Sequence, residues 1–381
     1  MDNPAGVPEV LAFGVATSPH FVGTRVVAST PVGVVDVGAL AASGLLTDGW
    51  WRGGVLHDFL AAGRTAWQQV MGELDVIDIE PGDQPHLGST ELHMQLPVVI
   101  GDYVDFYASR QHATNLGALL RPGQEPLTPN WTSMPIGYHG RSGTIVVSGT
   151  PVRRPNGQRR PNTNSPPEFG ASQRLDVEVE VGYVVGVPSR HGTPVPVGDF
   201  AQHVFGVCLV NDWSARDIQA WEGQPLGPFL GKSFATSISP WLVPLDVLAS
   251  ARVPVESAGS QLLPYLEESE PAGLGLTLSL AINGEVLSRP PYSSMFWSPA
   301  QMLAHMTVNG ASIRTGDLFA SGTVSGPAPE QWGSLIELFD NERFLSDGDE
   351  IVISATVDLG EAPKSLGEVR GIVLPQTGAR E

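Results

Sequence analysis

The stretch RLDVEVEVGY, at residues 174–183, alternates strictly between charged and apolar side chains. Asp176, Glu178 and Glu180 fall on one parity, and valines occupy the positions between and after them. Because the side chains of a strand point alternately to its two faces, the pattern predicts a strand with three carboxylates on one face. That face either meets water or holds a positive charge, and the alternation alone leaves both interpretations open.

The composition of the whole chain favours the same kind of structure. Its 381 residues include 44 glycines and 33 prolines, which indicates strands joined by many turns rather than a helical bundle. The pair Asn156-Gly157 predicts a hairpin turn. Strands are expected at 143–152, 174–187, 203–211, 235–245, 274–288 and 348–358. Helices are expected in parts of 50–74 and at 105–120, 213–222 and 298–308. We therefore expect a mainly β fold with some α.

Charge and cysteine usage exclude several classes of protein. The formal net charge of −19 gives no general attraction for the phosphates of nucleic acids or for anionic membranes. The longest apolar stretch, 26–46, is broken by Pro31 and Asp36 and does not suit a membrane span. The single cysteine, Cys208, excludes an internal disulfide and is expected in the core. With no basic segment in the first twenty residues, these features predict a cytoplasmic protein.

Polar side chains also gather in two further segments. If 105–120 is helical, Asp105 and His112 lie two turns apart on one face, although an N-cap and a buried histidine explain them equally well. Asp212 ends an apolar strand, and Arg216 and Gln219 follow it at helical spacing. An acid backed by an arginine and an amide is a common way to build a polar site.

The remaining motifs narrow the chemistry. Lys232 stands in GPFLGKS, which is one residue too short between its glycines to be a phosphate-binding loop. The sequence contains no nucleophile elbow, no H-E-x-x-H and no dinucleotide fingerprint. The histidines lack ligand spacing, so a metal here is expected on carboxylates. An oxygen-only set of ligands suits Ca²⁺, Mg²⁺ or Mn²⁺ better than Zn²⁺ or Cu²⁺.

Taken in order, several long motifs resemble the fumarylacetoacetate hydrolase family. The resemblance covers most of 101–358 and, more weakly, the N-terminal region. The motifs are DFYASRQHATN, LTPNWTSMPIGYHGRSGTIVVSGTPVRRPNGQ, LDVEVEVGYVVG, VNDWSARDIQAWE, PLGPFLGKSFATSISPWLVP and GDLFASGTVSGPAPEQWGSLIEL. The resemblance implies a small SH3-like N-terminal β-barrel at 1–97 and a catalytic domain at 98–381, folded as a larger mixed β-sandwich roll. It also implies a homodimer that hydrolyses a C–C bond of a small β-diketo acid, with fumarate and acetoacetate as products.

The same resemblance assigns roles residue by residue. The implied ligands of Ca²⁺ or Mg²⁺ are Asp105, Glu178, Glu180 and Asp212, with Lys232 and Thr236 close to the ion. The implied catalytic residues are His112, Glu337, Arg216, Gln219 and Lys232. The implied substrate-binding residues are Tyr107, Arg121, Tyr138, Gln219 and Thr323. Asp176 matches no position with a known role.

One departure and two alternatives accompany these expectations. Gly223 stands where the animal members of the family have a substrate-binding tyrosine, so one hydrogen-bond donor to the ligand is absent. A sister enzyme, such as an acylpyruvate or fumarylpyruvate hydrolase or a decarboxylase, is the first alternative. The long N-terminal region and PNWTSMPIGYHGR favour fumarylacetoacetate as the substrate instead. A non-catalytic Ca²⁺-binding β-module is the second alternative, but it leaves His112 and Glu337 without a purpose.

Overall fold

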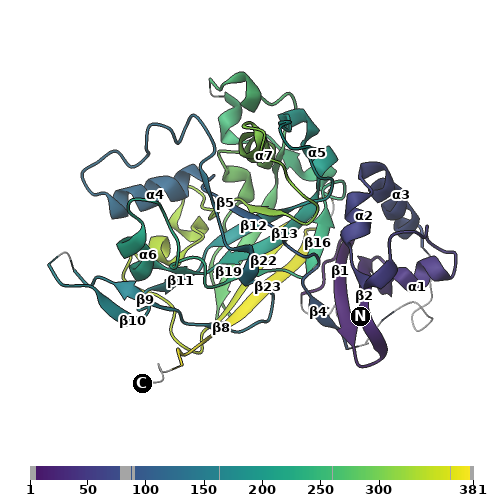
Figure 1. Cartoon of the computed structure of the whole chain (residues 1–381), viewed down its shortest axis with the longest axis horizontal. Coiled ribbons are helices and arrows are strands. Elements are labelled where there is room, and N and C mark those ends of the chain that lie inside the picture. The colour runs from purple at the N-terminus through teal and green to yellow at the C-terminus, as the bar shows by residue number, and fades with distance from the viewer. Residues whose placement is uncertain are drawn as a thin grey trace.

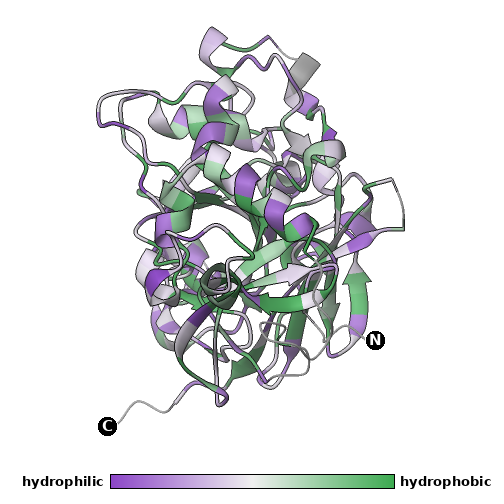
Figure 2. Ribbon diagram, turned by 90° about the vertical axis from the view of Figure 1, so that its right-hand side faces the viewer, coloured by the Kyte–Doolittle hydropathy of each residue, from purple (hydrophilic) through white to green (hydrophobic). Residues whose placement is uncertain are grey.

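The computed structural model describes residues 6–77, 87, 91–162, 164–259, 261–360 and 362–377. Strands form the interior and helices lie around them, so the fold is a mixed, β-rich one, as the composition predicts (Figure 1). Apolar residues concentrate on the central strands (Figure 2). Among the described residues, no helix is long and apolar enough to span a membrane.

A twelve-stranded sheet runs through the molecule. Its main path is β3 (Gly33–Asp36), β2 (Phe21–Thr30), β1 (Ala12–Ser18), β16 (Trp241–Pro244), β13 (Val204–Asp212), β12 (Val179–Val185), β21 (Leu318–Ala320), β5 (Tyr103–Phe106) and β6 (Gly137–His139). Three strands branch from it: β4 (His93–Gln95), β7 (Ile145–Val147) and β15 (Thr236–Ile238). β12 and β13 pair antiparallel along their whole length, whereas β21 and β5 run parallel. This order places the ends of β13, β12 and β5 near one another.

A second sheet of five strands packs against β13. It consists of β20 (Glu285–Ser288), β19 (Leu276–Ile282), β22 (Glu350–Val357), β23 (Lys364–Leu374) and β8 (Val152–Arg153). Trp213, which follows β13, is fully buried, and its ring lies against Gly371 of β23, where a Cβ would come within 2.7 Å of it. The remaining two-stranded pairs are β9 (Asn156–Arg159) with β10 (Glu168–Ala171), β11 (Leu175–Asp176) with β14 (Ser214–Ala215), and β17 (Arg252–Val253) with β18 (Gly273–Leu274).

The helices are short and lie outside the sheets (Figure 1). They are α1 (Val37–Ala42), α2 (His57–Ala61), α3 (Arg64–Asp75), α4 (Arg110–Leu120), α5 (Phe200–His203), α6 (Arg216–Glu222), α7 (Pro299–Thr307) and α8 (Leu335–Leu338). Ser298 caps α7 in a capping box with Gln301, which confirms the helix predicted after SSMFWSP. The helices α1 to α3 belong to the N-terminal region, and α4 and α6 lie at the opposite end of the molecule.

The N-terminal region continues the large sheet. β1 pairs with β16 at Phe13 and Leu242, and Phe13 packs on the rings of Phe59 and Phe205. The side chain of Arg64 forms an ion pair with Asp246 at 2.7 Å. β1 to β4 are joined antiparallel, but no pairing among the described residues closes them into a barrel.

Some of the predicted local structure is wrong. Asp105 lies on β5, and α4 starts only at Arg110, with Ser109 as its N-cap, so Asp105 and His112 share no helical face. Asp105 also caps no helix. Asn156-Gly157 forms no turn but lies in β9, where Gly157 lets Ile218 of α6 come close: a Cβ there would be 2.6 Å from Ile218 Cδ1.

Other strands are broken or were not expected. The strand predicted at 274–288 is a hairpin that turns at Asn283-Gly284, both with positive φ, which suits a tight two-residue turn. The strand predicted at 235–245 is divided into β15 and β16. β23 was not expected from the sequence, although it is the longest strand of the second sheet. Cys208 is buried, as predicted, and burial raises the pKa of its thiol to about 12.

Candidate active site

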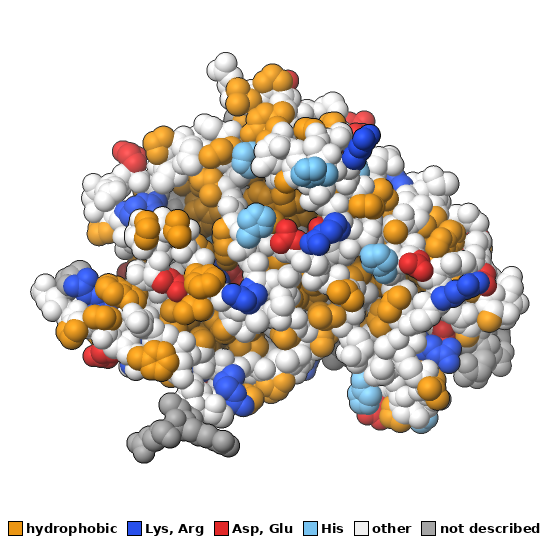
Figure 3. Space-filling model, viewed as in Figure 1, with side chains coloured by type: hydrophobic (Ala, Val, Ile, Leu, Met, Phe, Trp, Pro, Cys, Tyr) orange, Lys and Arg blue, Asp and Glu red, His pale blue; other side chains and the backbone are white. Residues whose placement is uncertain are grey.

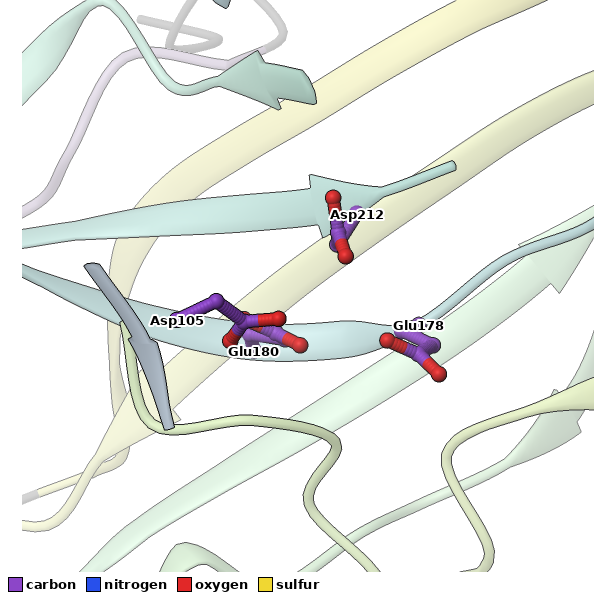
Figure 4. A group of neighbouring side chains, drawn as sticks. All are labelled: Asp105, Glu178, Glu180 and Asp212. Carbon is purple, nitrogen blue, oxygen red and sulfur yellow. The ribbon is translucent and has the colours of Figure 1, made fainter. Parts of the chain in front are cut away.

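Four carboxylates meet at the ends of three strands (Figure 4). One oxygen from each of them lies within 4.8 Å of the others, and all four residues are buried. They are Asp105 of β5, Glu178 just before β12, Glu180 of β12 and Asp212 at the end of β13. The structure therefore brings together all four of the predicted metal ligands, and we call this group the acidic cluster.

The pairing of β12 with β13 explains why the acidic cluster forms. The backbone N–H of Asp212 donates to the carbonyl of Glu178 at 3.2 Å, which sets these two residues opposite each other. Glu180 follows two residues on, and β21 separates its strand from β5, which carries Asp105. Because Asp176 and Glu180 are fully buried and Glu178 is 4% exposed, the water-facing interpretation of RLDVEVEVGY is wrong.

Lys232 and Thr236 surround Asp212. The Lys232 ammonium forms ion pairs with Glu178 and with Asp212 Oδ2, the latter at 2.6 Å. The Thr236 hydroxyl donates to Asp212 Oδ1 at 2.9 Å, and the Tyr138 hydroxyl reaches Asp212 Oδ2 at 3.5 Å. Burial would lower the pKa of Lys232, but the ion pairs with Asp212 and Glu178 raise it. Lys232 thus neutralises one side of the acidic cluster.

The other side of the acidic cluster has no such partner. Among the described residues, neither carboxylate oxygen of Glu180 accepts a hydrogen bond, and Asp105 Oδ1 also lacks one. A buried carboxylate without a partner is costly, and carboxylate oxygens are the ligands that Ca²⁺ and Mg²⁺ prefer. Among the described residues, the four acids form ion pairs with two lysine or arginine side chains, Lys232 and Arg216. The donor set therefore fits a bound divalent cation.

The pKa values within the acidic cluster diverge. Burial, followed by repulsion from neighbouring acids, raises the pKa of Asp105 and of Glu180 well above the ordinary range. Burial also raises the pKa of Asp212, partly offset by Lys232. Burial acts in the same direction on Glu178, but Lys232, Arg216 and His112 outweigh it and lower its pKa to about 2. Glu178 is therefore the residue of the acidic cluster whose ionised form the neighbouring side chains stabilise most strongly.

A histidine–acid pair lies beside the acidic cluster. His112 Nδ1 is 2.7 Å from Glu337 Oε2, and the other ring nitrogen, Nε2, is 4.0 Å from Glu178 Oε1. Asn115, Ser325 and Ser334 donate to Glu337 at 2.6–3.0 Å. Burial would raise the pKa of Glu337, but His112, Ser334 and Asn115 lower it. An ionised Glu337 fixes the ring of His112 with Nε2 toward the acidic cluster.

Arg216 forms the third part of the site. Its Nε donates to Asp176 at 2.8 Å, and its Nη1 contacts Glu178 Oε1 at 2.8 Å and Gln219 Oε1 at 3.3 Å. Its Nη2 is buried and has no hydrogen-bond partner among the described residues. Asp212 lies on β13 and caps no helix, because α6 begins at Arg216. The prediction that Asp212 shares a helical side with Arg216 and Gln219 is therefore wrong for Asp212.

The predicted substrate-binding residues have different surroundings, unlike the metal ligands, which lie in one cluster. The ring of Tyr107 meets that of His112 edge-on, with 5.4 Å between centroids. Thr323 is buried, and its hydroxyl has no partner in the described part of the chain. Arg121 follows α4 and donates to the carbonyl of Pro126 at 2.6 Å. Gly223 ends α6 and presents no side chain to the site.

The chain is similar to known proteins over most of its length. Residues 102–373 match the model of the fumarylacetoacetate (FAA) hydrolase C-terminal family. The chain belongs to the fumarylacetoacetate hydrolase family. It is similar to the fumarylacetoacetase of Rattus norvegicus, with 43% identity over 84% of this chain and 83% of that protein. The fumarylacetoacetase of Arabidopsis thaliana is 41% identical, over 84% of this chain and 82% of that protein.

A solved member of the family supports the fold. The structure of the fumarylacetoacetate hydrolase from the psychrophilic Exiguobacterium antarcticum superposes with a TM-score of 0.59 at 18% sequence identity. The match covers 96% of this chain and 100% of that one. At this identity the likeness concerns the arrangement of strands and helices alone.

The sequence did not predict the residues that contact Glu337 and Arg216 and fix their positions. Ser325, Ser334 and Asn115 all donate to Glu337, and Asp176 contacts Arg216. Asn115 lies one turn beyond His112 on α4, which was a usable signal. No pattern in the sequence connects Asp176 with residues 334–337, since that contact exists only in the folded chain.

Proposed function

We propose that this protein hydrolyses the C–C bond of fumarylacetoacetate, producing fumarate and acetoacetate. The observation that carries the proposal is 43% identity to a fumarylacetoacetase over 84% of the chain. The arrangement of His112, Glu337 and the acidic cluster supports it, because a base next to a carboxylate-lined metal site suits hydrolysis of a polarised ketone. Hydrolysis of this compound is the last step of tyrosine and phenylalanine degradation through homogentisate.

The acidic cluster is the proposed site of Ca²⁺ or Mg²⁺. Asp105, Glu178, Glu180 and Asp212 would hold the ion through oxygen, with Lys232 and Thr236 next to it. When bound, the ion would supply Lewis-acid polarisation of the diketone oxygens. The unpartnered oxygens of Glu180 support this assignment.

His112 is the proposed general base. Glu337 accepts the hydrogen bond of Nδ1–H, which leaves Nε2 free to take a proton from water. The water oxygen then bonds to the ketone carbon next to the fumaryl double bond. The C–C bond on its other side breaks, and its electron pair passes to the carbon that becomes the methyl group of acetoacetate. That carbon takes the proton back from His112, so the proton count closes.

Arg216, Gln219 and Lys232 are the proposed stabilisers of the negative charge that develops on the attacked ketone oxygen. Nη2 of Arg216 is a buried donor that has no hydrogen-bond partner among the described residues. Gln219 Oε1 accepts a hydrogen bond from Arg216 Nη1, and we assign its amide N–H groups to the substrate. Fixed donors in a buried place stabilise an oxyanion without reorganising.

The substrate carboxylates and the diketone need further contacts. We assign these to Tyr107, Arg121, Tyr138, Gln219 and Thr323. The buried, unpartnered hydroxyl of Thr323 supports its assignment. A local cation such as Arg121 is needed because the chain as a whole carries a net charge of −19. With glycine at 223, the substrate lacks the tyrosine contact and is expected to use water there.

The wider organisation is proposed on the family resemblance. It comprises an SH3-like N-terminal domain at 1–97, a β-sandwich roll at 98–381, a homodimer and a cytoplasmic location. The antiparallel pairing of β1 to β4 supports an N-terminal β unit, and these strands continue the twelve-stranded sheet through the pairing of β1 with β16. The face shown in Figure 3 carries scattered charges of both signs. The net charge of −19 supports a small-molecule substrate rather than a nucleic acid.

The test follows the diketone absorbance of fumarylacetoacetate after mixing with the purified protein. We expect it to disappear, and we expect a chelator to abolish the reaction until Ca²⁺ or Mg²⁺ is restored. Unchanged turnover by His112→Ala would overturn the role of the base. A panel with acylpyruvates and fumarylpyruvate separates the sister enzymes, whose substrates we expect to turn over more slowly.

A further inference from the structure

Asp176 contacts both Arg216 and the helix that carries Glu337, although the family motifs give it no role. It is fully buried, and its Oδ2 accepts a hydrogen bond from Arg216 Nε at 2.8 Å. Its Oδ1 accepts from the backbone N–H of Leu335 at 2.7 Å, and its Oδ2 also accepts from that of Ile336 at 3.2 Å. One carboxylate therefore joins α6, which carries Arg216, to α8, which carries Glu337.

The contact with α8 replaces a normal helix cap. The first N–H groups of a helix need an acceptor, which the N-cap side chain commonly provides. The N-cap of α8, Ser334, makes no such hydrogen bond, and its hydroxyl donates instead to Glu337 Oε2 at 2.6 Å. Because Asp176 accepts hydrogen bonds from the first two backbone N–H groups of α8, the hydroxyl of Ser334 is available to donate to Glu337.

The contact with Arg216 sets the rotation of its guanidinium group. Nε is held by Asp176 and Nη1 by Glu178, so the planar group has no freedom to turn. Nη2 is then left buried and without a partner among the described residues. The orientation of that free donor follows from where Asp176 lies.

We propose that Asp176 is a positioning residue that places Arg216 and the Glu337–His112 pair at fixed positions relative to each other. Asp176 does not belong to the acidic cluster, and the inference rests on the proposed function only for the reaction that it assists. A carboxylate is required, since it accepts at both oxygens. An asparagine would turn an NH₂ group toward one of the converging N–H donors.

The first measurement is steady-state turnover of fumarylacetoacetate by Asp176→Asn. We expect kcat to fall about 100-fold, with KM changed by less than about threefold, because binding contacts remain while the reacting groups are displaced. The matched control is Asp36→Asn. Asp36 is also buried, also caps a helix through Ala39 N–H, and also pairs with an arginine, Arg25, but it lies in the N-terminal region. We expect its kcat and KM to stay at wild-type values.

A double-mutant cycle tests the route of the effect. If Asp176 acts through the Glu337–His112 pair, the loss of kcat/KM in Asp176→Asn combined with Glu337→Gln stays within about threefold of the worse single variant. A merely structural role predicts losses that multiply. As a readout without substrate, proton NMR follows the deshielded Nδ1–H of His112. We expect this signal in the wild type and in Asp36→Asn, and its loss or shift in Asp176→Asn.

The outcomes separate this proposal from the proposed function. A wild type that does not turn over fumarylacetoacetate contradicts the function, while the NMR signal still decides the role of Asp176. Full kcat in Asp176→Asn or an equal loss in Asp36→Asn would overturn the proposal, and multiplying losses would overturn its claim on the Glu337–His112 pair. If Asp176→Asn does not fold, Asp176→Glu, which keeps the charge but displaces the oxygens, is measured in the same way. Failure of both to fold would assign Asp176 to the fold and overturn the proposal as well.

Discussion

His112 Nδ1 lies 2.7 Å from Glu337 Oε2, although 225 residues separate the two in the chain. Both side chains are buried, and the contact of α4 with α8 brings them together. Because Nδ1 faces Glu337, Nε2 is directed toward the acidic cluster, 4.0 Å from Glu178 Oε1. This geometry supports the proposed roles of His112 as general base and of Glu337 as its orienting acid.

Replacing Glu337 by glutamine tests this pair. Glu337→Gln keeps the shape but removes the negative charge that stabilises a protonated ring. We expect kcat to fall by about 100-fold, in the range typical of general-base assistance, with a smaller change in KM. Stopped-flow or steady-state kinetics measure it. Glu73→Gln, which alters an acid bonded to Thr47 in the N-terminal region, serves as the control and should retain wild-type kinetics.

Replacing Glu180 by glutamine should have opposite effects on the metal-free and the metal-bound protein. The raised pKa of Glu180, caused first by burial and then by its acidic neighbours, means that its charge destabilises the metal-free fold at neutral pH. Glutamine removes that charge, so we expect the metal-free protein to gain about 1–3 kcal/mol in the free energy of unfolding.

The same variant should bind Ca²⁺ at least about tenfold more weakly, since a charged ligand is lost. Thermal unfolding with and without Ca²⁺, together with calorimetric titration, measures both effects. Asp317→Asn, a buried acid paired with Arg314 outside the acidic cluster, should leave Ca²⁺ binding unchanged. Unaltered Ca²⁺ affinity in Glu180→Gln would remove Glu180 from the ligand set.

A methyl group at Gly231 should disturb Lys232. A Cβ there would lie 2.8 Å from the backbone nitrogen of Gln219 on α6, closer than real contacts allow. The loop must move, and Lys232, the next residue, moves with it. For Gly231→Ala we expect a loss of about 1–3 kcal/mol in stability and a fall in kcat.

The control for this substitution is Gly72→Ala. Gly72 is exposed on α3, and a Cβ there meets nothing within 4 Å. Because alanine restricts the unfolded chain and favours the helix, we expect a gain of about 0.5–1 kcal/mol with unchanged kcat. Full activity in Gly231→Ala would show that the loop tolerates the shift.

The ion pair of Arg64 with Asp246 should contribute to stability in a pH-dependent way. Burial would raise the pKa of Asp246, but hydrogen bonds from Arg64 and Gln68 and the charge of Arg64 lower it. A lowered carboxyl pKa stabilises the fold above the ordinary pKa of aspartate, and this contribution is lost as the pH falls below about 4.

Asp246→Asn should therefore be less stable than the wild type by about 0.5–1 kcal/mol at pH 7. The difference should stay constant down to about pH 4 and shrink as the pH falls further, below the ordinary pKa of aspartate. Urea unfolding of both proteins across this pH range measures it. A difference that grows on acidification would contradict the assignment of the effect to this ion pair.

Local sequence patterns predicted the elements whose residues interact mainly with their neighbours in sequence. The capped helix α7 and the strand β13 are found where they were expected. The patterns failed where distant packing decides. Asp105 joined β5 rather than a helix because β21 and β6 pair with that segment, and Gly157 joined β9 because Ile218 packs against it.

The sequence by itself determined the acidic chemistry of the site and, through its motifs, the family. It placed Glu178, Glu180, Asp105 and Asp212 as candidates for one ion, and His112 with Glu337 as a pair. Only the tertiary structure decided that Asp176 is buried against Arg216 and α8 rather than exposed to water. Alternation records which side of a strand a residue takes. It does not record what the rest of the chain places there, and for Asp176 that is Arg216 and the first turn of α8.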